Sequence, residues 1–184
     1  LDIDEKKIEV LSKGKSFIKH IPDEKIQTLN EVGSFMASAD FVHIENLDCI
    51  LICVPTPLNK NREPDMSYIV STAKQIAPHI KNDQLIILES TTYPGTTQDV
   101  LSPELESGSG LRSNKDFFVA YSPEREDPNN KDYTTASIPK VIGSDHPAGL
   151  EISEALYSCI INTTVPVSST RVAEATKLME NIFR

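Results

Sequence analysis

Three short motifs contain side chains of the kind that acid–base chemistry requires. Residues 89–97 (ESTTYPGTT) join a carboxylate to a row of hydroxyl groups and a Pro-Gly turn, which suit a phosphate, a ribose or a catalytic water. Residues 121–128 (YSPEREDP) contain Glu124, a candidate general base or water-orienting group, and Arg125, whose guanidinium suits a phosphate or carboxylate. Residues 174–184 (EATKLMENIFR) repeat polar positions at a spacing that predicts one helix face, namely Glu174, Lys177, Asn181 and Arg184.

Each motif also has a purely structural interpretation. The hydroxyls of residues 89–97 are typical of a helix cap and a turn, residues 121–128 of a solvated charged loop, and the polar stripe of residues 174–184 of a helix face in water. Glu89 fits this interpretation least well. It ends an apolar strand, and a buried carboxylate requires hydrogen-bonding partners.

Two further motifs lie where predicted strands end. Asp2, in the opening LDID, matches the acidic strand end that accepts hydrogen bonds from an adenosine ribose and repels the 2′-phosphate of NADP. Alternatively, Asp2 and Asp4 only cap the following helix. In residues 54–57 (VPTP), the prolines fix the backbone and Thr56 offers a hydroxyl and an N–H group. An ordinary strand-ending turn is the alternative there.

Strands and helices alternate along the chain that must position these motifs. Apolar runs at 49–54 and 85–88 predict strands buried on both faces. An amphipathic helix is expected over 4–13, closed by Gly14, and another over 24–37 with Asp23 as its N-cap. We expect further strands at 117–121, 140–143 and 163–167, helices at 67–80, 96–101, 146–159 and 169–184, and a polar loop at 105–115.

This alternation predicts an α/β fold, with a doubly wound, mostly parallel, Rossmann-like sheet covered on both sides. Ligands of such sheets bind outside the carboxyl ends of the strands. All the polar motifs cluster at those ends. The fold therefore predicts that they share one site.

Composition excludes several classes of protein. A net charge of −9 without a basic run argues against a nucleic-acid surface, and 39% hydrophobic residues argue against disorder. No apolar run in the sequence is long enough to span a bilayer, and we expect no signal peptide. The three cysteines are expected to be unpaired core residues, which suits a cytoplasmic protein, and neither they nor the four histidines predict a metal site.

The motifs together are more specific than any one of them. In their order and spacing, the chain resembles the UDP-glucose/GDP-mannose dehydrogenase family, and within it the UDP-N-acetylhexosamine 6-dehydrogenases. The resemblance covers essentially all 184 residues. It rests on CVPTPL at 53–58, ESTTYPGTT at 89–97, YSPER at 121–125, IPKVIG at 138–143 and EATKLMENIFR at 174–184.

The resemblance implies oxidation of C6 of a UDP-sugar, from alcohol to carboxylate, by two NAD+ in succession. It implies that Thr91 and Glu124 hold a catalytic water and that Lys177 stabilises the oxyanion, with Asn181 as its catalytic partner at the sugar. Cofactor contacts are implied for Asp2, Lys7, Val54, Thr56 and Thr91. Substrate contacts are implied for Glu124, Arg125, Glu126, Lys177, Asn181 and Arg184.

Two features of the family lie outside the sequence. Its glycine-rich phosphate loop precedes the acidic strand end, and its nucleophilic cysteine would follow Arg184. We therefore expect a fold that lacks its first strand, an NAD-binding domain at 1–167 and the start of a linking helix at 168–184. Such a fragment is expected to be inactive alone, and the full-length protein to be a cytoplasmic homodimer or higher oligomer.

Two other functions are compatible with parts of the pattern. Another two-domain NAD(P) dehydrogenase, of the hydroxyacid or 6-phosphogluconate type, would share the sheet and Asp2 but would not need the SPER and Lys-x-x-x-Asn motifs. A non-catalytic Rossmann module would bind a nucleotide without Glu124 and Lys177. The presence of both residues favours the sugar-nucleotide dehydrogenase.

Overall fold

The structure, a computed structural model, describes residues 1–60, 62–124 and 136–182. The chain divides into two compact units, Leu1–His43 and Ile44–Arg184, and each is described by itself. Among the described residues, none of the helices combines the length and the apolar character that crossing a lipid bilayer demands.

The first unit contains two helices joined by a glycine turn. Helix α1 spans Glu5–Ser12, and the Asp4 side chain caps it by accepting a hydrogen bond from the Lys6 N–H. Gly14 follows with φ of +72°, and a Cβ there would lie 2.8 Å from the Gln27 Cγ. This close approach and the left-handed backbone both require glycine.

Helix α2 spans Asp23–Glu31, so the prediction of a helix over 24–37 was wrong at its C-terminal end. Gly33, at φ of +67°, donates its N–H to the Asn30 carbonyl, and the Ser34 N–H bonds the Leu29 carbonyl. These two bonds form a Schellman motif, which ends the helix. Asp23 is also not the N-cap: it is the first helical residue, and its carboxylate accepts from the Ser16 N–H.

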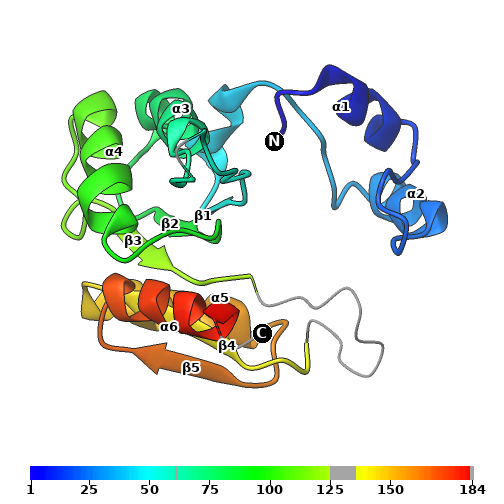
Figure 1. The fold of residues 1–184 in the computed structure, drawn as a ribbon. Coiled ribbons are helices and arrows are strands. Elements are labelled where there is room, and N and C mark those ends of the chain that lie inside the picture. The colour runs from blue at the N-terminus through cyan, green and yellow to red at the C-terminus, as the bar shows by residue number, and fades with distance from the viewer. Residues whose placement is uncertain (61, 125–135, 183–184) are drawn as a thin grey trace. The chain divides into compact units, whose positions relative to one another are not determined.

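The second unit is built on a five-stranded sheet (Figure 1). Its strands are adjacent in chain order: β1 Cys49–Ile52, β2 Leu85–Leu88, β3 Phe118–Tyr121, β4 Lys140–Ser144 and β5 Thr164–Val167. All neighbours are parallel except β3 and β4. The predicted α/β fold with a mostly parallel sheet is confirmed.

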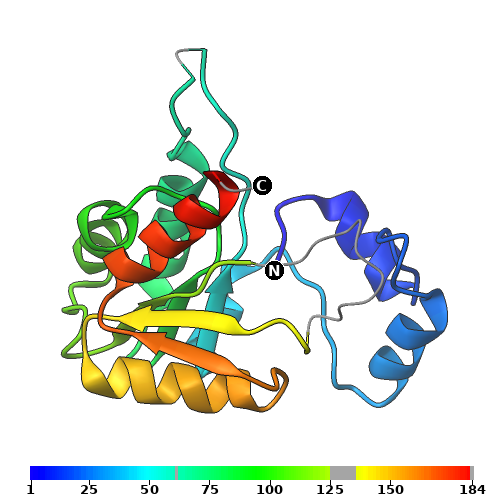
Figure 2. The same cartoon turned by 60° about the horizontal axis from the view of Figure 1, so that its bottom comes forward.

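Helices cover both faces of this sheet. Helix α5 (Pro147–Ser158) packs on β2 to β5, while α6 (Thr170–Ile182) packs on β3 to β5 from the opposite side, as Figure 2 shows. On the α6 side, α3 (Ser67–Ile76) and α4 (Ser102–Ser109) pack against each other. The described residues also form short helical turns: η1 Phe41–Asn46, which begins in the first unit and ends in the second, and η2 Ala77–His79 and η3 Thr97–Leu101 in the second unit.

Alternation along the strands fills the core beneath α5. Leu85, Ile87, Ala120 and Ile142 point to one face and pack against Tyr157 and Ile161. On the other face α6 approaches β4 so closely that a Cβ on Gly143 would lie 2.2 Å from the Ser169 carbonyl oxygen. Only glycine permits this contact, which fixes the height of α6 above the sheet.

Several predicted boundaries differ from the structure. The loop predicted at 105–115 begins instead as helix α4, because Leu105 is fully buried and the helix continues to its C-cap Gly110, at φ of +73°. The helix predicted at 67–80 ends at Ile76 and continues as η2. Strand β1 ends at Ile52 and is not buried on both faces, since Leu51 is 43% exposed.

Candidate functional site

The polar motifs lie at one edge of the sheet, where three strands end and a fourth begins. The register aligns Ile52, Leu88 and Tyr121, the last residues of β1, β2 and β3, beside Gly143 of the antiparallel β4. The residues that follow these strand ends, together with Lys140 at the start of β4, therefore lie close together. As expected, the motifs after β1, β2 and β3 meet at this edge.

A carboxylate at the end of β2 has three partners from other elements. Glu89 Oε1 accepts from Lys140 Nζ at 2.8 Å and from the Tyr157 hydroxyl at 2.5 Å, while Oε2 accepts from Cys53 Sγ at 3.3 Å. We call these four residues the Glu89 cluster. The side chains of Lys140 and Glu89 are only 8% and 11% exposed, so this ion pair is nearly buried. Lys140 Nζ also lies 5.0 Å from the centre of the Tyr157 ring.

The Glu89 cluster suppresses ionisation of its neutral members. Desolvation, followed by the nearby Glu89 carboxylate, raises the pKa of the Cys53 thiol to about 12. The same two causes raise the pKa of Tyr157 far above its ordinary value. Both side chains therefore act as hydrogen-bond donors to Glu89 at neutral pH.

The prediction that all three cysteines are core residues was wrong. Cys53 and Cys159 are exposed and only Cys49 is partly buried, although all three thiols are unpaired. The Cys53 thiol is bound to Glu89, and the Cys159 thiol donates to the Ala155 carbonyl within its own helix. Both exposed thiols therefore have a polar partner, which the apolar run around Cys53 does not reveal.

Lys177 and Glu124, 53 residues apart in sequence, meet in the structure. Lys177 Nζ donates to the main-chain oxygen of Glu124 at 2.5 Å, and Lys177 is only 8% exposed. The Glu124 carboxylate is 51% exposed, with its Oε2 atom 3.9 Å from Lys140 Nζ. Glu124 thus lies between two lysines, and its carboxylate remains accessible to a ligand or a water molecule.

A second buried carboxylate connects α6 to the loop after β2. Glu174 is fully buried, and its carboxylate accepts from the Gly95 N–H at 2.5 Å, the Thr97 N–H at 2.9 Å and the Thr97 hydroxyl at 2.7 Å. We call these three residues the Glu174 cluster. Burial raises the pKa of Glu174, and the hydrogen bonds from Thr97 and Gly95 oppose that rise.

The loops that follow β1 and β2 are joined directly. The Thr56 hydroxyl donates to the Thr91 carbonyl at 2.6 Å, and the Ser90 hydroxyl donates to the Val54 carbonyl at 2.7 Å. Thr91 itself is exposed. The two threonines predicted to face a cofactor are therefore adjacent.

The first unit contains the predicted ribose-binding pair. Lys7 Nζ lies 3.1 Å from Asp2 Oδ2, and Asp2 Oδ1 accepts from the Asp4 N–H at 2.9 Å. That backbone hydrogen bond is the largest cause that lowers the pKa of Asp2, and Lys7 adds to it. Asp2 is thus an anionic acceptor that belongs to the unit Leu1–His43.

The remaining predicted site residues are an exposed asparagine and three residues outside the described part of the chain. Asn181 is exposed, whereas Glu174 and Lys177 on the same helix are buried, so the predicted polar face continues into solvent at its end. Arg125, Glu126 and Arg184 lie outside the described residues.

Sequence reasoning missed two members of the site. Lys140 lies in the IPKVIG motif and Tyr157 near the end of α5, but neither was given a role. A lysine inside a predicted buried strand was the available signal, because such a lysine requires a counter-charge. Among the described residues, no group of three His, Cys, Asp or Glu side chains has the arrangement of a metal site.

Comparison with known proteins identifies close relatives of this chain. Residues 1–161 match the profile described as the UDP-glucose/GDP-mannose dehydrogenase family, NAD binding domain. UDP-N-acetyl-D-glucosamine 6-dehydrogenase of Pseudomonas aeruginosa is 37% identical over 157 residues, which are 85% of this chain and 37% of that protein.

Solved structures agree with the sequence matches. UDP-D-ManNAc dehydrogenase from Pyrococcus horikoshii superimposes with a TM-score of 0.90 at 30% identity, over 100% of this chain and 44% of that one. GDP-mannose dehydrogenase from Pseudomonas aeruginosa gives a TM-score of 0.89 at 29% identity, over 100% and 43%. The chain therefore spans less than half the length of these relatives.

Proposed function

Because the chain belongs to the UDP-glucose/GDP-mannose dehydrogenase family, we propose that the protein oxidises C6 of a UDP-sugar to the uronic acid with NAD+. The preferred substrate in this proposal is a UDP-N-acetylhexosamine. Relatives named for UDP-N-acetylglucosamine and UDP-N-acetylmannosamine, at 37% and 31% identity, support that choice. The product would be a precursor for polysaccharide synthesis.

The observation that carries the proposal is the contact between Lys177 and Glu124. The buried Lys177 ammonium donates to the main-chain oxygen of Glu124, and the side chain of Glu124 carries a half-exposed carboxylate at the edge where the strands end. Oxidation of an alcohol needs this combination, because the proton of the hydroxyl must leave while negative charge develops on its oxygen.

In the first oxidation, from alcohol to aldehyde, proton removal and oxyanion stabilisation fall to residues of this chain. When bound, the nicotinamide of NAD+ accepts the hydride that leaves C6. Glu124 takes the hydroxyl proton through a water that the Thr91 hydroxyl also holds, and the Lys177 ammonium stabilises the developing oxyanion. Asn181, Arg125, Glu126 and Arg184 complete the substrate contacts in this proposal.

The second oxidation, from aldehyde to acid, requires a second NAD+ and a thiolate nucleophile. Cys53 is unsuited to that step, because its pKa of about 12 keeps the thiol protonated and its proton is donated to Glu89. We assign the nucleophile to none of Cys49, Cys53 and Cys159, because none of the three matches the nucleophile's motif in the family.

Asp2 and its surroundings fit the adenosine ribose of NAD. The lowered pKa keeps the carboxylate charged, and a carboxylate that accepts from Asp4 and Lys7 retains lone pairs for the ribose hydroxyls. Its negative charge opposes a 2′-phosphate, which favours NAD over NADP. Lys7, Val54, Thr56 and Thr91 complete the proposed cofactor contacts.

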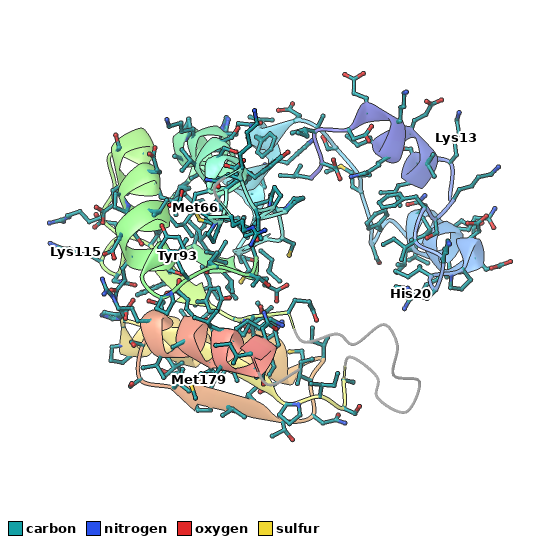
Figure 3. The ribbon with its side chains drawn as sticks, in the orientation of Figure 1. Lys13, His20, Met66, Tyr93, Lys115 and Met179 are labelled. Carbon is teal, nitrogen blue, oxygen red and sulfur yellow. The ribbon has the colours of Figure 1, made fainter. Side chains whose placement is uncertain are left out.

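The proposal extends to organisation and compartment. Residues 1–167 would form the NAD-binding domain and residues 168–184 the start of a linking helix. Helix α6 exposes four apolar side chains, which supports a homodimer or higher oligomer: Val172, Leu178, Met179 (labelled in Figure 3) and Ile182. Three unpaired thiols favour the cytoplasm. Light scattering that gives a monomeric mass would contradict the oligomer.

The decisive experiment is an assay of the protein at its full natural length. We expect NADH formation with NAD+ and UDP-N-acetylglucosamine or UDP-N-acetylmannosamine, and less with UDP-glucose or GDP-mannose. Lys177→Ala should lower kcat by roughly 10²-fold or more, because an oxyanion-stabilising charge acts mainly in the transition state.

Lys115→Ala is the matched control, since Lys115 is an exposed lysine on the same unit (Figure 3). It should retain the activity of the wild type. Absence of NADH formation with every sugar nucleotide would disprove the proposed function, and a fully active Lys177→Ala variant would remove Lys177 from the mechanism.

A further inference from the structure

Helix α6 is attached to the strand-end loops at two positions one helical turn apart. Lys177 binds the main chain of Glu124 in the loop after β3, and Glu174 binds Gly95 in the loop after β2 and Thr97 at the start of η3. Residues three apart lie on the same helix face, so the side chains of Glu174 and Lys177 both face the strand-end loops. One helix thereby spans the loops that carry Thr91 and Glu124.

The attachment through Glu174 is directional and fully buried. Its carboxylate accepts three hydrogen bonds, all from neutral donors, over sequence separations of 77 and 79 residues. Burial of a carboxylate costs free energy that these bonds must offset. An apolar side chain in the same space would leave the Gly95 N–H, the Thr97 N–H and the Thr97 hydroxyl without this acceptor, so Glu174 does more than fill space.

Docking of α6 on its neighbours is already provided by other contacts. Ala173 packs so closely on β4 that a Cβ on Gly143 would lie 2.8 Å from the Ala173 Cβ. At the protein surface, the Arg171 guanidinium binds Asp99 at 2.8 Å and also contacts Gln98. What Glu174 adds is a fixed position for the N–H groups of the loop itself. That loop begins at Glu89 and contains Thr91.

We propose that Glu174 is a positioning residue for the oxidation, which holds the loop of Thr91 in register with Lys177 and Glu124. The inference rests on the proposed function. Glu174 itself does not touch the substrate or the cofactor; it acts through the relative placement of the three groups that do. A small displacement of such groups is enough to lower a rate by about 10²-fold.

Kinetics of four variants of the full-length protein test the proposal. Glu174→Gln replaces one acceptor oxygen by a donor that faces N–H or O–H groups, so kcat should fall by roughly 10- to 100-fold while both KM values stay within about threefold. Thr97→Val removes the hydroxyl bond alone and should lower kcat less. Thr97→Ser keeps that bond and should restore the wild-type rate.

Arg171→Gln is the control for helix docking. It breaks the exposed contact between α6 and η3 and leaves the Glu174 cluster intact, so kcat should stay near that of the wild type. If Arg171→Gln lowers kcat as much as Glu174→Gln does, Glu174 serves only to attach the helix, and the proposal is wrong.

A double-variant cycle separates positioning from general loss of structure. Because Glu174 places the loop of Thr91 relative to Lys177 as well as to Glu124, Glu174→Gln should lower kcat by a smaller factor in the Lys177→Ala background than in the wild type. Independent, multiplicative effects would overturn the proposal. The Thr97 pair decides the matter if Glu174→Gln fails to fold: equal rates for Thr97→Val and Thr97→Ser would also overturn it.

Hydrogen exchange provides a readout that does not depend on turnover. The amides of Gly95 and Thr97 should exchange faster in Glu174→Gln than in the wild type, with little change in α5. A wild-type protein that lacks dehydrogenase activity would disprove the proposed function, whereas unchanged exchange at these two amides would disprove the role of Glu174.

Discussion

Two carboxylates are buried at the same edge of the sheet, and their surroundings differ. In the Glu89 cluster an ammonium, a phenol and a thiol donate hydrogen bonds to the carboxylate, and one of these three partners, the ammonium, carries a full positive charge. In the Glu174 cluster two backbone N–H groups and one hydroxyl meet it, and all three are neutral.

The difference shows two ways of keeping a carboxylate away from water. An ion pair balances charge but depends on a single partner, and it leaves a buried ion behind when that partner is lost. A set of neutral donors depends on geometry, and it leaves part of the desolvation cost in place, which agrees with the raised pKa of Glu174. The first arrangement is therefore sensitive to loss of charge, and the second to pH and displacement.

Removal of the positive charge from the Glu89 cluster should have the largest effect. We expect Lys140→Met to lower the free energy of unfolding by about 3–5 kcal/mol, because Glu89 is left buried without its counter-charge. Urea unfolding followed by circular dichroism measures this change. The double variant Glu89→Gln/Lys140→Met should recover most of the loss.

The exposed pair of Lys74 and Glu104 provides the control. Lys74 is 65% exposed and its Nζ lies 3.8 Å from the glutamate oxygen, so Lys74→Met should change stability by less than about 1 kcal/mol. If Lys140→Met behaves like Lys74→Met, the contrast between a charge-balanced and a neutral cluster loses its basis.

The second prediction concerns the pH dependence that distinguishes the Glu174 cluster. A carboxyl group with a raised pKa binds more protons in the folded state than in the unfolded state. Its contribution to stability is therefore complete below the unfolded-state pKa, and it is lost as the pH rises through the higher, folded-state pKa. For Glu174 this window begins near the ordinary value of 4.5 and extends upward.

Glu174→Gln carries no charge at any pH and should lack this dependence. At about pH 4 the wild type should be more stable by about 1–2 kcal/mol, the value of a lost buried hydrogen bond, and the difference should shrink as the pH rises toward neutrality. Thermal unfolding of both proteins over this range measures it. Parallel stability curves would show that burial does not govern the ionisation of Glu174.

Sequence reasoning succeeded where a local pattern fixes the structure. Strand β2 was predicted at its observed bounds, because four consecutive apolar residues leave few alternatives. It failed at α4, where Ser107, Gly108 and Ser109 are weak helix formers and the burial of Leu105 outweighs their propensities. The helix predicted over 24–37 is too long, because a Schellman turn at Gly33 ends α2 at Glu31.

In the site, too, features fixed by a local motif were predicted and long-range pairings were not. Glu124 and Lys177 were identified from their motifs, but the partners of Glu89 were not, since Lys140 and Tyr157 lie 51 and 68 residues away in sequence. One sequence contains no information on which distant residues pair. The topology of the sheet, with β4 antiparallel to β3, brings Lys140 to the edge where β2 ends.

The smallest predicted effect concerns the reactivity of Cys53. Because the Glu89 carboxylate contributes to the pKa of about 12 at Cys53, Glu89→Gln should lower that pKa and increase the thiolate fraction. Alkylation of Cys53 by iodoacetamide at mildly alkaline pH should then proceed several-fold faster than in the wild type, as followed by peptide mass spectrometry. Cys159, exposed on another part of the same unit, is the internal control and should react at an unchanged rate. An equal acceleration at both cysteines would indicate general loosening of the fold, and no acceleration at Cys53 would mean that desolvation alone, and not the charge of the Glu89 cluster, keeps this thiol protonated.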